Sequence, residues 1–126
     1  MNTEDKNYLL QIENLSVQFR TVEGTVLAVD KMNFQVSEGE TLGIVGESGS
    51  GKSVSSLAVM GLIPNPPGEV VSGRIIFNGI DLLQLSEKEL EKIRGNEISM
   101  IFQEPMTSLN PILSCGFQIA ESLMLH

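Results

Sequence analysis

The first forty residues alternate between apolar and polar side chains, a pattern that predicts antiparallel β-strands. Over the second half of residues 9–20, apolar side chains occupy every second position, as in a strand with one buried face. A Glu-Gly turn signal at residues 23–24 precedes a returning strand, which begins at residue 25 and continues to residue 36. We therefore expect the chain to open with a β-hairpin.

A change of spacing further along predicts a strand followed by a helix. The apolar run at residues 41–45 stops at Gly46, as expected of a short buried strand. From residue 52 onward, apolar side chains recur at helical spacing and would line one face of a helix. These side chains are Val54, Leu57, Ala58 and Leu62. Gly61 and the proline-rich residues 64–68 would end that helix.

More strands and helices are predicted after the proline-rich segment. Residues 73–77 have a strand pattern that ends at a hairpin-type Asn-Gly turn. Residues 86–94 begin with a capping box, Ser-Glu-Lys-Glu, and predict a short charged helix. Residues 98–102 predict another strand, and residues 119–123 belong to a final helix. This order favours an α/β fold in which antiparallel strands lead into a central strand.

Composition narrows the possible functions. The chain has 126 residues, 41% of them hydrophobic, which is enough for one packed domain. A net charge of −8 disfavours nucleic acid as a partner. Residues 1–8 are interpreted as a flexible tail, too polar at the start for a signal peptide, and residues 9–126 as the domain. Cys115 is the single cysteine and is expected to be an inert core residue.

The clearest chemical signal is a phosphate-binding loop (P-loop) at residues 46–53, which match G-x-x-x-x-G-K-[ST] at every fixed position. Its members are Gly46, Glu47, Ser48, Gly49, Ser50, Gly51, Lys52 and Ser53. Glycines let successive N–H groups point inward at a helix N-terminus, where they bind phosphate. Lys52 would reach the β- and γ-phosphates of ATP, and the Ser53 hydroxyl would ligate Mg²⁺. The alternative is a Gly/Ser-rich turn, but the flanking strand and helix patterns favour the P-loop.

Two other candidates for the chemistry are weaker. Hydrolysis needs an acidic Mg²⁺ partner at the end of an apolar strand, and residues 26–30 superficially fit this pattern with Asp30. They lie just upstream of the P-loop strand, where an antiparallel meander is more natural, so Asp30 is interpreted as structural. His126 is the last residue and is not expected to be catalytic. No catalytic residue is assigned.

Together these residues resemble the ATPase subunit of an ATP-binding cassette (ABC) transporter, and more narrowly the ATP-binding subunits of oligopeptide, dipeptide and nickel importers. The similar stretches are residues 15–19, 28–29, 46–53, 72–75 and 101–111. The last reads Ile-Phe-Gln-Glu-Pro-Met-Thr-Ser-Leu-Asn-Pro and is typical of that subfamily. The resemblance covers nearly the whole chain after residue 8 and implies an α/β P-loop NTPase core of the ABC-ATPase type with an antiparallel β-subdomain.

The resemblance also implies roles for two residues outside the P-loop. Gln103 matches the Q-loop glutamine, which would contact Mg²⁺ or the attacking water and link nucleotide occupancy to a transmembrane partner. Otherwise Gln103 is an ordinary polar residue at a strand end. Phe19 falls where the family places the aromatic ring that stacks on adenine. The alternative is that Phe19 joins Leu15 and Val17 on the buried face of its strand.

The function implied for the intact parent is import of peptides, or nickel, energised by binding and hydrolysis of ATP with Mg²⁺. Its partners would be transmembrane permease subunits, a second ATP-binding subunit in a homo- or heterodimer and, indirectly, a solute-binding protein. The subunit would be peripheral, on the cytoplasmic face of the cell membrane.

One departure from the family bears on activity. The signature motif Leu-Ser-Gly-Gly-Gln, the acidic magnesium strand with its catalytic glutamate and the switch histidine do not occur in the 126 residues. The chain is therefore interpreted as the amino-terminal part of the domain, truncated before the signature motif, and is predicted to be inactive alone. Two alternatives are a nucleotide-binding module without hydrolysis and a different P-loop enzyme such as a small kinase. The absence of a recognisable acceptor-binding lid disfavours the kinase.

Overall fold

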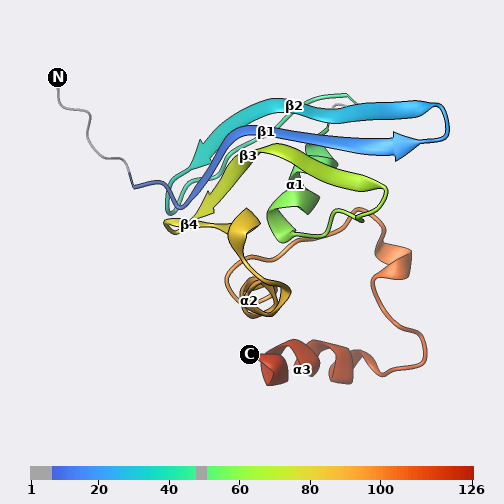
Figure 1. Ribbon diagram of the computed structural model, residues 1–126. Coiled ribbons are helices and arrows are strands. Elements are labelled where there is room, and N and C mark those ends of the chain that lie inside the picture. Colours follow the sequence, from blue (N-terminus) through green and yellow to red (C-terminus); the bar gives the residue numbers. More distant parts are fainter. Residues whose placement is uncertain (1–6, 48–50) are drawn as a thin grey trace. The chain divides into compact units, whose positions relative to one another are not determined.

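The computed structural model describes residues 7–47 and 51–126 (Figure 1). The chain divides into two compact units, Met1–Leu85 and Ser86–His126, which are described one after the other. Most of the predicted tail lies outside the described residues, and so do Ser48, Gly49 and Ser50 of the P-loop.

The first unit is built on a four-stranded antiparallel sheet with the strand order β2-β1-β3-β4 (Figure 1). The strands are β1 (Leu10–Thr21), β2 (Gly24–Val36), β3 (Gly68–Phe77) and β4 (Ile80–Asp81). The predicted opening hairpin is confirmed, because β1 and β2 pair from Leu10 opposite Val36 to Thr21 opposite Gly24. The Asn78-Gly79 turn between β3 and β4 is confirmed as well.

The core of this unit lies between the sheet and the helix α1 (Lys52–Met60), which contacts β1 and β2 (Figure 1). The buried apolar residues of the sheet and helix are Ile12, Leu15, Val17, Val29, Ala58, Val59, Met60, Ile75 and Phe77. Ala58 is buried as predicted, whereas Val54 and Leu57 are only half-buried. The helix packs against β1 and β2 with Ser55 and Val59 among its buried residues, which helical periodicity alone could not establish.

The predicted strand at residues 41–45 is wrong, because this segment is coil in the structure. Its apolar side chains are exposed, with Leu42, Ile44 and Val45 at 40%, 42% and 95% of their full accessibility. A central parallel strand is held by hydrogen bonds to neighbouring strands. Among the described residues no strand pairs with this segment, so an apolar sequence alone does not make it a strand.

The second unit contains the helices α2 (Glu87–Ile93) and α3 (Cys115–Leu125) with a short 3₁₀ turn, η2 (Pro105–Thr107). The predicted capping box of α2 is confirmed: the Glu89 N–H donates to the Ser86 hydroxyl at 3.4 Å, and the Ser86 N–H donates to the Glu89 carboxylate at 2.7 Å. The predicted final helix is confirmed as α3, capped by the Ser114 hydroxyl, which accepts from the Phe117 N–H.

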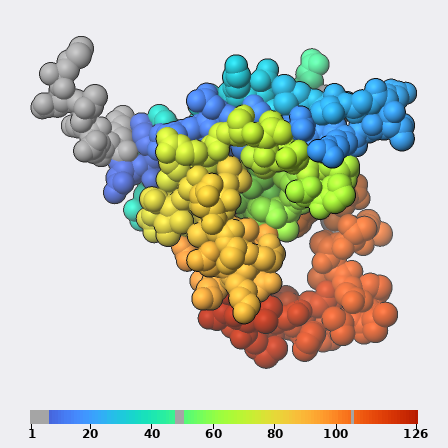
Figure 2. All heavy atoms as spheres, viewed as in Figure 1, coloured from blue at the N-terminus to red at the C-terminus, as the bar shows by residue number. Residues whose placement is uncertain are grey.

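Two expectations for the second unit are wrong. Residues 98–102 do not form a strand; Ile98 makes an isolated bridge to Arg94, and Ile101 and Phe102 are 98% and 53% exposed. Cys115 is exposed rather than part of a core. The physical reasons differ. Residues 98–102 have no partner strand among the described residues beyond that one bridge. Cys115 begins α3, which has no buried residue and is seen at the surface of the second unit (Figure 2).

Candidate phosphate-binding site

The last glycine of the P-loop, Gly51, is fixed by its backbone conformation and by its neighbours. Gly51 is the N-cap of α1, is buried, and has φ +90° and ψ +4°, the left-handed region that favours glycine. A Cβ at this position would lie 2.7 Å from the carbonyl oxygen of Ala28 and 3.2 Å from Cγ2 of Val29. Residue 51 is therefore seated directly on β2 and must be glycine for two independent reasons.

The N-terminus of α1, next to this contact between Gly51 and Ala28, is suited to binding an anion. Among the described residues no side chain caps the helix, and its first turn contains no acidic residue. The Ser55 N–H donates to the Gly51 carbonyl at 2.9 Å, which makes it the first amide bonded within the helix. The preceding N–H groups of α1 have no intrahelical acceptor, and they carry the positive end of the helix dipole. A phosphate group would satisfy both.

The Lys52 ammonium bonds to the first residues of the P-loop. It donates to the carbonyl oxygens of Gly46 and, at 3.4 Å, of Glu47, so the lysine connects the residues before positions 48–50 with the helix after them. Within the described residues Lys52 forms no ion pair with a carboxylate. Its charge is therefore balanced only by backbone dipoles, and phosphate oxygens could replace these weaker acceptors.

The three serines after Lys52 differ in what their hydroxyls do. Those of Ser55 and Ser56 donate to the Lys52 carbonyl at 2.8 and 3.2 Å. The Ser53 side chain is exposed and forms no hydrogen bond to any described residue. Of the three, Ser53 thus has the hydroxyl free to ligate a metal, as the motif predicts. In the described part of the chain no group of three acidic, histidine or cysteine side chains could hold a metal ion.

Phe19 lies near the C-terminal end of β1, opposite Val26 on β2 and Gly68 on β3. A Cβ on Gly68 would lie 2.8 Å from Cε1 of Phe19, so the ring packs over this glycine. Leu15 and Val17 are fully buried, whereas Phe19 is only half-buried. The ring therefore has both a packing contact and an accessible portion, and adenine stacking stays a prediction.

The remaining predicted residues lie in different surroundings. Gln103 is exposed at a bend in the second unit, without the preceding strand that was expected. Asp30 is exposed on β2, and the pairing of β2 with β1 confirms that residues 26–30 belong to an antiparallel meander. The reading of Asp30 as structural stays a prediction. Nothing in the sequence indicated a role for Ala28. Its contact with Gly51 is made by a backbone carbonyl, and the pattern of side chains does not indicate backbone contacts.

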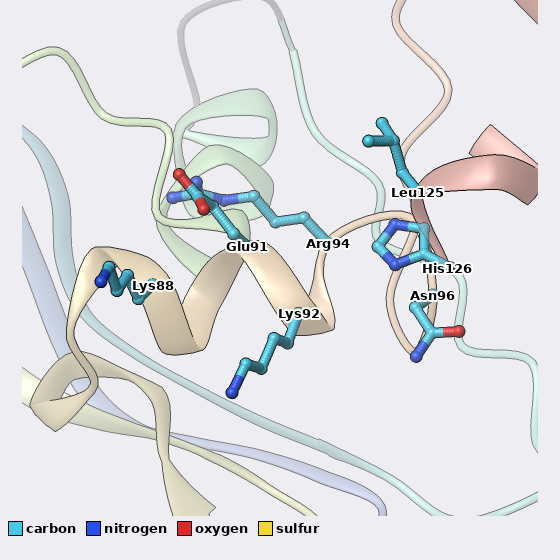
Figure 3. A pocket seen from close by; sticks show the side chains of 7 residues that line it. All are labelled: Lys88, Glu91, Lys92, Arg94, Asn96, Leu125 and His126. Carbon is cyan, nitrogen blue, oxygen red and sulfur yellow. The ribbon is translucent and has the colours of Figure 1, made fainter. Parts of the chain in front are cut away.

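A cavity of about 790 Å³ in the second unit contains none of the predicted site residues. Lys88, Glu91 and Lys92 of α2 line it, with the side chains at the end of the chain on its other side (Figure 3). The cavity also includes Arg94, whose guanidinium pairs with Glu87 and lowers the pKa of that carboxyl. Its lining mixes acidic and basic side chains and, among the described residues, contains no glycine-rich loop, so we do not assign a nucleotide site to it.

Comparison with known proteins identifies the class to which this fold and loop belong. The family model for ABC transporters matches residues 29–120, and the chain belongs to that family. The dimeric structure of the bacterial ABC transporter cassette MJ0796 has a TM-score of 0.78 and 27% identity, over 91% of this chain and 47% of that one. Its post-hydrolysis form bound to ADP and Pi has a TM-score of 0.75 and 25% identity. The predicted fold class is confirmed.

Among curated proteins, the relatives are transport ATP-binding proteins for peptides. The oligopeptide transport ATP-binding protein OppD of Bacillus subtilis (strain 168) is 56% identical over 118 residues, which are 94% of this chain and 33% of that protein. The dipeptide transport ATP-binding protein DppD of Escherichia coli (strain K12) is 53% identical over 118 residues, 94% of this chain and 36% of its own. The chain thus spans about a third of the length of these relatives. The predicted resemblance is confirmed.

Proposed function

We propose that this chain forms the amino-terminal part of the ATP-binding subunit of a peptide importer and that its P-loop binds the phosphates of ATP. The seat of Gly51 on Ala28 is the observation that carries the proposal. This contact fixes the N-terminus of α1, which no described side chain caps, next to the Lys52 ammonium. The curated relatives, named for transport of oligopeptides and dipeptides, support peptides as the cargo and give nickel no particular support.

The residues of the site would divide the work of binding. Backbone N–H groups at the start of α1 would donate to phosphate oxygens, and Lys52 would exchange its two carbonyl acceptors for the β- and γ-phosphates. Ser53 would present its hydroxyl to Mg²⁺, which when bound neutralises charge on the phosphates. Gln103 would add a polar contact to the metal or the attacking water, as the family resemblance implies.

The family resemblance and the relatives' names also support a proposal for the partners of the intact subunit. The subunit would act with transmembrane permease subunits on the cytoplasmic face of the membrane, and a solute-binding protein would be an indirect partner. The described residues include no helix long and apolar enough to cross a membrane. A second ATP-binding subunit is proposed because the similar cassette is dimeric in its solved structure.

Titration calorimetry with ATP and Mg²⁺ tests the proposal. We expect the chain to bind ATP and Lys52→Ala to weaken that binding tenfold to a hundredfold, since a charge-assisted hydrogen bond is worth about 1.5–3 kcal/mol. Lys88→Ala is the matched control, because it removes an exposed lysine from α2 in the other unit. Equal affinity for ATP in the Lys52→Ala variant and the unmodified chain would remove Lys52 from the site.

A further inference from the structure

A line of irregular backbone crosses three neighbouring strands of the sheet. Asn14 on β1, Lys31 on β2 and Gly73 on β3 all have positive φ, at +48°, +46° and +100°. The register shifts at this level in both the β1–β2 and the β1–β3 pairing. A Cβ on Gly73 would lie 2.5 Å from the Asn14 carbonyl oxygen, so the bulges are in direct contact. Bulges of this kind bend strands and increase their twist.

Two side chains form hydrogen bonds with backbone N–H and carbonyl groups at these bulges. The carboxamide oxygen of Asn33 accepts from the Asn14 N–H at 2.9 Å, and its Nδ2 donates to the Asn14 side chain at 3.1 Å and to the Lys31 carbonyl at 3.0 Å. The buried Ser16 hydroxyl accepts from the Lys31 N–H at 3.0 Å. Ser16 and Asn33 therefore hold the bulge on β2 from its two sides.

The seat of the P-loop begins immediately beyond this bulge on β2. Val29 pairs with Val17 and is buried, and the Ala28 carbonyl beside it meets Gly51. The pairing shifts again between Val17–Val29 and Gln18–Leu27, which makes Ala28 an extra residue on β2. A shift of one residue reverses the direction of side chains and backbone groups along a strand. The direction of the Ala28 carbonyl therefore depends on two irregularities, the bulge at Lys31 on one side of Val29 and the extra residue Ala28 on the other.

We infer that Ser16 and Asn33 are positioning residues for the phosphate-binding loop. By fixing the bulge at Lys31 they set the pairing of Val29 with Val17. This pairing brings Val29 and its neighbour Ala28 to Gly51, and through Gly51 it orients the first turn of α1. Neither residue touches phosphate in this arrangement. The inference rests on the proposed nucleotide site and adds the part of the sheet that supports it.

The test combines ATP titration with amide hydrogen exchange in the 126-residue chain. Ser16→Ala removes the acceptor of the Lys31 N–H, and Asn33→Ala removes three bonds at an exposed position where folding is readily preserved. Each should raise the Kd for ATP roughly fivefold to tenfold, the effect of about one hydrogen bond. Each should also speed exchange of the Ser55 N–H, which bonds to Gly51. Ser16→Thr keeps the hydroxyl and should restore both readouts.

Two controls separate positioning from general stability. Ser72→Ala makes the same change at the exposed serine that pairs with Ser16 across β1 and β3. Ile75→Val destabilises the same core on the other side of the bulge line. Neither should change the Kd or the exchange of the Ser55 N–H. Equal effects of Ile75→Val and Ser16→Ala, or no effect of Ser16→Ala and Asn33→Ala, would overturn the inference. If the unmodified chain binds no ATP, the proposed function fails, and the exchange readout still decides the inference.

Discussion

Gly51, the last glycine of the P-loop, lies against the carbonyl oxygen of Ala28, so closely that a Cβ would come within 2.7 Å of that oxygen. The contact joins the start of α1 to the antiparallel sheet within the first unit. The P-loop is recognised in the sequence from the spacing of its residues, and this contact shows that a strand more than twenty residues earlier supports it. The carbonyl is backbone and cannot move aside without disturbing β2.

Gly51→Ala should therefore abolish measurable ATP binding and lower the stability of the first unit. The left-handed backbone costs a non-glycine residue about 1–2 kcal/mol, and the clash with Ala28 adds to that. Gly43→Ala is the matched control, since a Cβ there meets no atom within 4 Å and φ is not positive. ATP titration and urea denaturation measure the two effects. Equal ATP affinity in the Gly51→Ala and Gly43→Ala variants would show that this seat does not shape the site.

Phe19→Ala should weaken ATP binding while leaving the binding of inorganic phosphate unchanged, if the accessible part of the ring stacks on adenine. Stacking of an aromatic ring on a base is worth about 1–3 kcal/mol, or roughly fivefold to a hundredfold in Kd. Competition titrations with ATP and phosphate separate the two. Phe117→Ala, an exposed phenylalanine on α3, serves as the control. A parallel loss of both ligands together with a lower melting temperature would instead assign Phe19 to packing over Gly68.

The 126-residue chain should bind ATP without turning it over. Phosphoryl transfer depends on positioning and charge stabilisation, and these 126 residues contain no signature motif and no catalytic glutamate after Gln103. A phosphate-release assay with Mg²⁺ and saturating ATP should match the blank without protein. Steady turnover by a purified monomer that disappears in Lys52→Ala would contradict this prediction. It would also favour the alternative in which Asp30 is the acidic partner of Mg²⁺.

The capping box of α2 should lower the pKa of Glu89. Hydrogen bonding from the Ser86 N–H, and then from its side chain, lowers the pKa of Glu89 from 4.5. A lowered pKa in the folded chain means that this contribution to stability is present above the unfolded pKa and is lost as pH falls through the folded one. Ser86→Ala should move the pKa of Glu89 part of the way back, as measured by NMR of its carboxyl carbon. Ser114→Ala, which uncaps α3, should leave it unchanged; an identical pKa of Glu89 in Ser86→Ala would contradict the capping interaction.

Features set by a few neighbouring residues were predictable from the chain alone. The hairpin turn before Gly24, the Asn78-Gly79 turn and the capping box at Ser86 depend on local backbone preference and on partners within four residues. The P-loop was recognisable for a similar reason, because its spacing places glycine, lysine and serine where a strand-to-helix turn needs them. The family resemblance used the same local stretches and is confirmed by the comparisons.

Tertiary contacts decided what local sequence could not. Residues 41–45 and 98–102 have the composition of strands but form none, since a strand exists only through hydrogen bonds to its neighbours. Conversely, β3 begins at Gly68, earlier than predicted, because its first residues pair with β1. The support of Gly51 by the Ala28 carbonyl likewise depends on the two shifts in the pairing of β1 with β2 that lie on either side of Val29. Spacing along the chain determined which residues could meet a phosphate, and the pairing of distant strands decided how their loop is held.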